Sequence, residues 1–125
     1  MEEQVLSIEQ MRELQELGID NSKASMCWLL DGDPDEPYPY LAENKGYNPV
    51  FCKPTFTVHD ILKMLPKYIN KDDKTYFLTL LYDAAGCVFM YCTEHIKDVL
   101  YSVGSAKETD SAFRTIKWCK QNNYI

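Results

Sequence analysis

The chain has 125 residues, 46% of them apolar and 13% aromatic, which suits a single domain with a buried core and excludes a disordered chain. The net charge of −6 is uneven: residues 1–44 carry eleven acidic and two basic side chains, whereas residues 45–125 carry eight acidic and eleven basic. The acidic total therefore does not exclude a basic binding face in the second part of the chain.

A capped helix is the first predicted element. Ser7 and Gln10 have the spacing of a capping box, in which each side chain bonds the backbone of the other residue. Gly18 is predicted to end the helix, because glycine enters the left-handed C′ conformation without strain. The apolar stripe at helical spacing consists of Ile8, Met11, Leu14 and Leu17.

Residues 24–30 are predicted to form a strand. An acidic turn with two prolines follows at 31–37. Residues 38–41 suit a short returning strand at a sheet edge, because Pro39 cannot donate to a central ladder. Residues 44–54 contain glycine and two prolines and are predicted to be irregular.

The second predicted helix starts at Thr57, which with Asp60 forms another capping box, and it ends before Pro66. Residues 75–92 then read as a β-hairpin, because residues rich in strand formers flank a turn at 83–86. Gly86 suits a positive φ angle in that turn.

Residues 95–103 alternate as a strand would, although their apolar spacing also fits a helix; a third strand is the favoured prediction. The last helix is predicted over 108–121, with Ala112, Phe113, Ile116 and Cys119 on its apolar stripe. Together these elements predict a single compact α+β domain over residues 1–125. We expect a small, mainly antiparallel sheet with three helices on one side.

Location is predicted from what the sequence lacks. No apolar stretch approaches the roughly 18–20 residues that span a bilayer, and the N-terminus has no signal-peptide pattern. The cysteines are odd in number and irregularly spaced, which favours free, buried thiols in a reducing cytoplasm. They are Cys27, Cys52, Cys87, Cys92 and Cys119.

Catalysis by a cysteine–histidine pair has little support, since the histidines are only His59 and His95. Cys87, Cys92 and His95 are the nearest approach to a zinc site. Positions 87 and 92 differ by an odd number and point to opposite faces of a strand, so their ligand atoms do not converge. We expect a protein that is not an enzyme and holds no metal.

Asp31, Asp33 and Asp35 imitate the first ligands of a calcium loop. The pattern fails at its sixth position, where Glu36 replaces glycine, and at its twelfth, where Ala42 replaces glutamate. A solvated acidic turn is the favoured interpretation. Glycine-rich phosphate-binding motifs and the G-x-S-x-G elbow are also missing, and no cofactor is expected.

Interaction candidates remain. Trp28, Tyr38 and Tyr40 are aromatic candidates near the first strand, and Trp118 lies off the main stripe of the last helix, although tryptophans more often anchor a core. The leading hypothesis is a non-enzymatic accessory protein that binds another protein or itself. No membrane partner is expected. The alternative is a nucleic-acid-associated regulator that uses a basic face formed by Arg114, Lys117 and Lys120. The ordinary interpretation of these three residues is the solvated face of an amphipathic helix.

Four motifs follow one another along most of the chain: Leu14-x-x-Leu17-Gly18, Met26-Cys27-Trp28, Pro54-Thr55-Phe56-Thr57-Val58-x-x-Ile61-Leu62-x-x-Leu65-Pro66, and Ile116-x-Trp118-Cys119. This series resembles a group of small uncharacterised proteins of prophages and mobile elements in gut anaerobic bacteria. The last helix departs from that group, because its start at 108–112 is more polar. The resemblance implies a mobile-element origin and carries over no catalytic residue.

Overall fold

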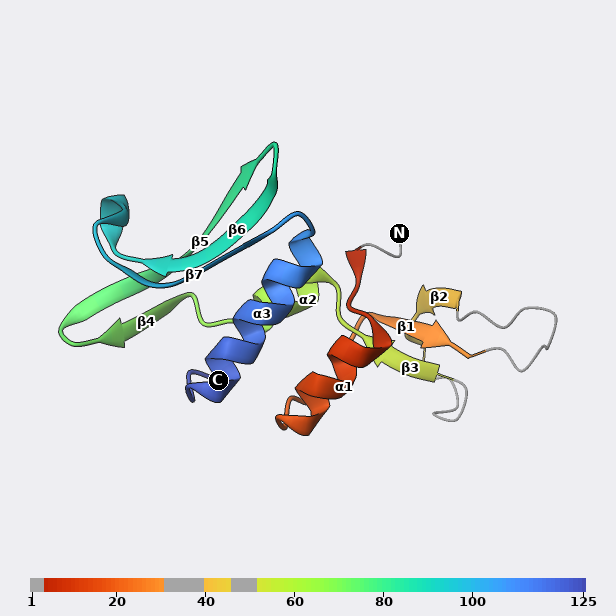
Figure 1. Cartoon of the computed structure of the whole chain (residues 1–125). Coiled ribbons are helices and arrows are strands. Elements are labelled where there is room, and N and C mark those ends of the chain that lie inside the picture. The colour runs from red at the N-terminus through yellow and green to blue at the C-terminus, as the bar shows by residue number, and fades with distance from the viewer. Residues whose placement is uncertain (1–3, 31–39, 46–51) are drawn as a thin grey trace. The chain divides into compact units, whose positions relative to one another are not determined.

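The computed structural model describes residues 4–30, 40–45 and 52–125 of the chain (Figure 1). They group into two compact units, Met1–Asp60 and Ile61–Ile125, and each unit is described by itself. The α+β class is confirmed, with three α-helices and two antiparallel sheets among the described residues. One domain over 1–125 stays a prediction.

The first unit begins with helix α1, Ile8–Glu16, and both of its predicted ends are confirmed. The Gln10 backbone N–H donates to the Ser7 hydroxyl at 3.1 Å, and the Ser7 N–H donates to the Gln10 side chain at 3.0 Å. Gly18 has a φ of +91°, and the N–H of Ile19 reaches back to the Leu14 carbonyl at 3.0 Å. These bonds satisfy carbonyls that the last helical turn leaves open.

A three-stranded sheet completes this unit. It has the order β2-β1-β3, with β1 at Met26–Leu29, β2 at Tyr40–Glu43 and β3 at Cys52–Thr55. The predicted first strand and the edge position of the second are confirmed. The acidic turn at 31–37 lies outside the described residues.

The irregular segment predicted at 44–54 is wrong at its end, where Cys52 to Pro54 belong to β3. Pro54 lies opposite Cys27 in the ladder, and β3 is an edge strand. An edge strand tolerates proline because one row of its backbone groups needs no ladder partner. Thr55 is fully buried, and its hydroxyl donates to the Leu6 carbonyl at 2.6 Å.

Helix α2, Val58–Met64, starts with the predicted capping box. The Asp60 backbone N–H donates to the Thr57 hydroxyl, and the Thr57 N–H donates to the Asp60 carboxylate, each at 3.0 Å. The helix ends two residues before Pro66, as proline geometry requires.

The second unit contains a four-stranded antiparallel sheet with the order β4-β5-β6-β7. Its strands are β4 at Tyr68–Lys71, β5 at Lys74–Asp83, β6 at Gly86–Cys92 and β7 at Val99–Ser105. The hairpin is confirmed. The strand predicted at 95–103 is confirmed from Val99 onward, whereas Glu94–Ile96 forms a short 3₁₀ helix. Strand β4 was not predicted, because Tyr68–Lys71 has only one buried side chain, Ile69, and so shows no apolar alternation.

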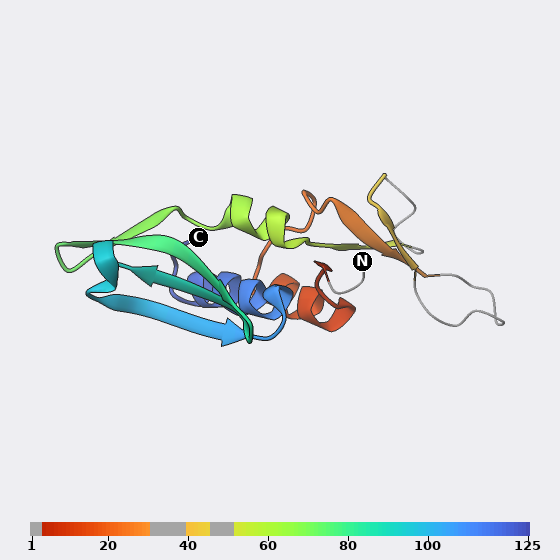
Figure 2. The ribbon, with the colours of Figure 1, turned by 90° about the horizontal axis from the view of Figure 1, so that it is seen from above.

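Helix α3, Glu108–Gln121, has the predicted bounds and packs on strands β6 and β7 (Figure 2). All four residues of its predicted stripe are buried. The Ser111 hydroxyl, also buried, donates to the Cys87 carbonyl at 2.8 Å. Among the described residues, no helix is long and apolar enough to cross a membrane.

Candidate functional site

Trp28 anchors the first unit. It is half-buried in β1, and its indole N–H donates to the Leu6 carbonyl at 3.1 Å. A tryptophan with its polar atom paired in this way stabilises the fold more directly than it offers a binding surface. Tyr40 is 42% exposed on the edge strand β2 and remains available to a partner, whereas Tyr38 lies outside the described residues.

Trp118 holds the end of α3 onto the sheet. Its ring stacks on Tyr101 with centroids 4.2 Å apart, and it meets Tyr91 at 5.9 Å and Tyr124 at 5.2 Å. Aromatic pairs at these separations add to the energy of burial. Its place off the main stripe therefore reflects a second packing contact inside the unit.

The predicted basic residues lie along α3. Arg114 is exposed, and Lys117 and Lys120 are partly exposed. The Lys117 ammonium lies 5.7 Å from the centre of the Phe113 ring, which is a cation–π distance. Two acidic residues, Glu108 and Asp110, lie in the first turn of the helix and precede these basic side chains. A nucleic-acid role for this face stays a prediction.

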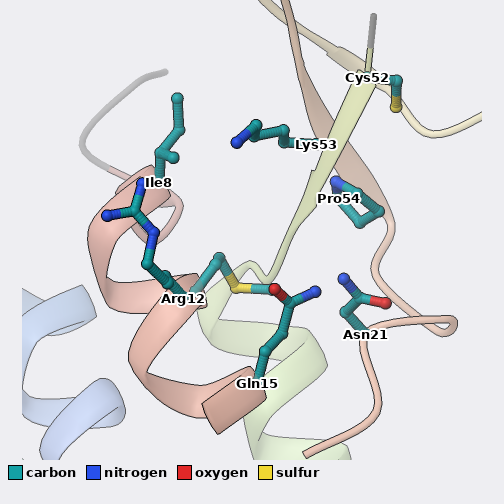
Figure 3. Close-up of a pocket in the computed structure, with 8 residues that line it drawn as sticks. Ile8, Arg12, Gln15, Asn21, Cys52, Lys53 and Pro54 are labelled. Carbon is teal, nitrogen blue, oxygen red and sulfur yellow. The ribbon is translucent and has the colours of Figure 1, made fainter. Parts of the chain in front are cut away.

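A pocket of about 410 Å³ lies in the first unit between α1 and β3 (Figure 3). Lys53 extends from β3 toward α1, where Arg12 lies, and neither forms an ion pair with a described residue. The rest of the lining mixes apolar and amide side chains: Ile8, Met11, Gln15, Asn21, Cys52 and Pro54. The sequence signal for it is the i, i+4, i+7 spacing of residues 8, 12 and 15, which places them on one helix face.

That pocket lacks an arrangement for catalysis. Cys52 supplies its only thiol, and Figure 3 shows Cys52 on the other side of the β3 ribbon from Lys53. The two face opposite sides of a strand because they are neighbours in sequence. The cations and amides suit contact with a negatively charged group and supply no base for a nucleophile.

All five cysteines are buried and unpaired. Burial, reinforced by the neighbouring Cys52 thiol, raises the pKa of Cys27 to about 11. Burial likewise raises the pKa of Cys119 to about 11, although its bond to the Tyr91 hydroxyl works in the other direction. Reactive cysteines have a lowered pKa, so these two thiols are of the structural kind.

We expect slow alkylation of all five thiols. Iodoacetamide at neutral pH should modify the folded protein at least about tenfold more slowly than the urea-unfolded protein. In the folded protein the fraction of thiolate is small, and the reagent cannot reach buried sulfur atoms. Mass spectrometry of quenched samples measures the rate for each cysteine. A single cysteine that reacts as fast in the folded as in the unfolded protein would contradict a purely structural role for that thiol.

Metal ligands do not gather in the part of the chain that the structure describes, where no group of three or more His, Cys, Asp or Glu side chains has suitable geometry. Cys92 donates to the Thr79 hydroxyl at 3.4 Å. His59 and His95 are both exposed. The acidic residues of the imitated calcium loop, Asp31 to Glu36, lie outside the described residues.

The sheet of the second unit has one face toward α3 and one face away from it. Cross-strand pairing assigns the faces: Tyr91 and Tyr101 are paired and contact Trp118, so their immediate neighbours Met90 and Ser102 point the other way. We call this second side the outer face. Its exposed apolar side chains, which no sequence motif marks, are Tyr68 at 56%, Phe77 at 42%, Leu81 at 44% and Val99 at 48%.

Comparisons with known proteins return no match: no protein family, no curated protein and no solved structure is similar to the chain. The resemblance to prophage proteins therefore stays a prediction.

Proposed function

We propose that this chain is a non-enzymatic protein-interaction module of the accessory type. The outer face of the second unit carries the proposal. Its four exposed apolar side chains come from three strands of one sheet and lie on the side away from α3. Scattered apolar residues are common on surfaces, but a set gathered on one sheet face marks a contact surface for another protein.

The chemistry of the other candidates supports the same proposal. Trp28 and Trp118 are engaged in their own units, and the thiols Cys27 and Cys119 have raised pKa values. The outer face contains aromatic and aliphatic groups of the kind that form the centre of protein interfaces. Binding through it buries apolar area and needs no reacting group.

The test compares partner capture by three immobilised proteins: the native chain, the double variant Phe77→Ser/Leu81→Ser, and Ile96→Ser as the matched control. Ile96 is 48% exposed but lies in the turn Glu94–Ile96, outside the strands. We expect the double variant to lose captured proteins that the control retains, with unfolding midpoints alike. Equal capture by all three, or capture by none, would refute this use of the outer face.

A further inference from the structure

We propose that edge strand β7 pairs antiparallel with β7 of a second copy of this chain, so that two four-stranded sheets join into one. This inference goes beyond the proposed function, because it concerns a different surface of the same sheet and names the partner. The surface consists of the outward backbone groups of Val99–Ser105, which we call the open edge.

One backbone hydrogen bond fixes which backbone groups the open edge presents. The Leu78 N–H donates to the Lys67 carbonyl at 3.0 Å, so the backbone of Leu78 points toward β4. Because Leu78 uses its backbone groups on β4, it makes no ladder bond to Tyr91, which lies opposite it in β6. The backbone groups of Tyr91 therefore point away from β5, toward β7. Since backbone groups alternate sides along an antiparallel strand, those of Tyr101 and Val103 bond inward to β6, whereas those of Ser102 and Gly104 point outward from the sheet edge.

The open edge has one irregularity, a register shift opposite Tyr91 and Cys92 near its start, but it lacks the other usual protections against pairing. Edge strands avoid association by being short or by carrying charges and proline. Strand β4, at the other edge of this sheet, has four residues and includes Lys71. Strand β7 has seven residues, VLYSVGS, with neither a charge nor a proline. Its outward residues Ser102 and Gly104 are exposed and have small side chains, so another backbone can approach closely.

The open edge is also complementary to itself. A twofold axis at Ser102, the middle of the strand, sets Ser102 opposite its own copy and sets the residues on either side of it opposite one another. Tyr101 then lies opposite Val103, an aromatic and β-branched pair that stabilises sheets. A charged residue on the axis would face its own copy in this arrangement, and β7 has no charged residue. Strand symmetry and neutrality together favour a second copy over an unrelated peptide.

The test measures molar mass by light scattering from micromolar to millimolar protein. The native chain should approach twice its monomer mass of 14.5 kDa. Ser102→Lys places two positive charges opposite each other and should raise the dissociation constant at least about tenfold. The matched control is Asn70→Lys, an exposed position on the outer face of the opposite edge strand, and it should associate as the native chain does.

A second variant keeps the test informative if Ser102→Lys does not fold. Ser102→Cys brings two thiols together across the twofold axis, and diamide, which takes up the two thiol hydrogens, should link them into a covalent dimer. The native cysteines are buried, so the native chain and Asn70→Cys should stay largely unlinked.

A native chain that stays monomeric at every concentration, or a dimer that Ser102→Lys leaves intact, would overturn pairing through the open edge. If the protein is monomeric but the outer-face variant still loses captured partners, this inference fails and the proposed function stands. If the dimer forms through β7 but capture does not depend on Phe77 and Leu81, the outer-face proposal fails and the edge pairing stands.

Discussion

Replacing Gly86 with alanine is expected to lower the free energy of unfolding by about 3 kcal/mol, because a side chain there combines backbone strain with a steric clash. Gly86 has a φ of +144°, a region that residues with a side chain rarely adopt. A Cβ atom at this position would lie 2.1 Å from the Ser105 carbonyl oxygen and 2.7 Å from the Ala106 Cα. Both obstacles are backbone atoms, so a change of rotamer cannot relieve them.

The control for this substitution is Gly104→Ala in the adjacent region of the same sheet. A Cβ atom at Gly104 meets the Val88 Cγ2 atom at 3.3 Å, which is a side-chain contact that a small movement relieves. We expect a change within about 1 kcal/mol for this variant. Urea denaturation followed by circular dichroism measures both. Equal effects for the two variants would show that the turn accommodates a side chain at Gly86.

Local signals explain why much of the fold could be predicted from the sequence. Ser7 with Gln10, Thr57 with Asp60, and Gly18 act within one turn of the chain, so their geometry follows from nearby residues alone. The hairpin is local too, because Gly86 and the strands beside it are contiguous. These elements appear in the structure where the sequence placed them.

The missed strands depend on partners that are distant in sequence. Strand β3 contains Pro54, and it is a strand because it pairs with β1 about 26 residues earlier. Strand β4 follows Pro66 closely and has one buried residue, so its pairing with β5 defines it. Neither segment carries the alternating pattern that announces a half-buried strand.

The candidate site was harder to predict than the fold. Trp28 and Trp118 stood out by residue type, yet the Leu6 carbonyl and the Tyr101 ring engage them. The outer face combines one residue from β4, two from β5 and one from β7, and only the strand register shows that they share a side. The pocket beside Arg12 likewise requires the packing of α1 against β3.

Replacing Asp60 with alanine is expected to lower the free energy of unfolding by about 2–3 kcal/mol at neutral pH, because a buried carboxylate that accepts several hydrogen bonds is lost. Its Oδ2 atom accepts from the Ser25 N–H at 3.0 Å, the Ser25 hydroxyl at 2.8 Å and the Thr57 N–H at 3.0 Å. The carboxylate therefore caps α2 and ties its start to Ser25, the residue before β1.

Acid should remove this contribution. Burial alone would raise the pKa of Asp60, but the hydrogen bonds from Ser25 and Thr57 outweigh burial and hold its pKa below the ordinary value of 3.8. A lowered folded-state pKa means that the stabilisation is complete above the unfolded-state value and disappears as the pH falls below it. The native chain should thus lose stability in acid faster than Asp60→Ala, and the gap between the two should narrow below about pH 4.

Asp20 provides the matched control, because it makes the same kind of contacts at an exposed site. It accepts from the Ser22 N–H at 2.9 Å and from the Ser22 hydroxyl at 2.8 Å. We expect Asp20→Ala to leave the free energy of unfolding almost unchanged, since water replaces those bonds at an exposed site. Urea titrations across the acid range for the three proteins give the comparison. A gap between the native chain and Asp60→Ala that stays constant with pH would mean that the Asp60 charge does not stabilise the fold.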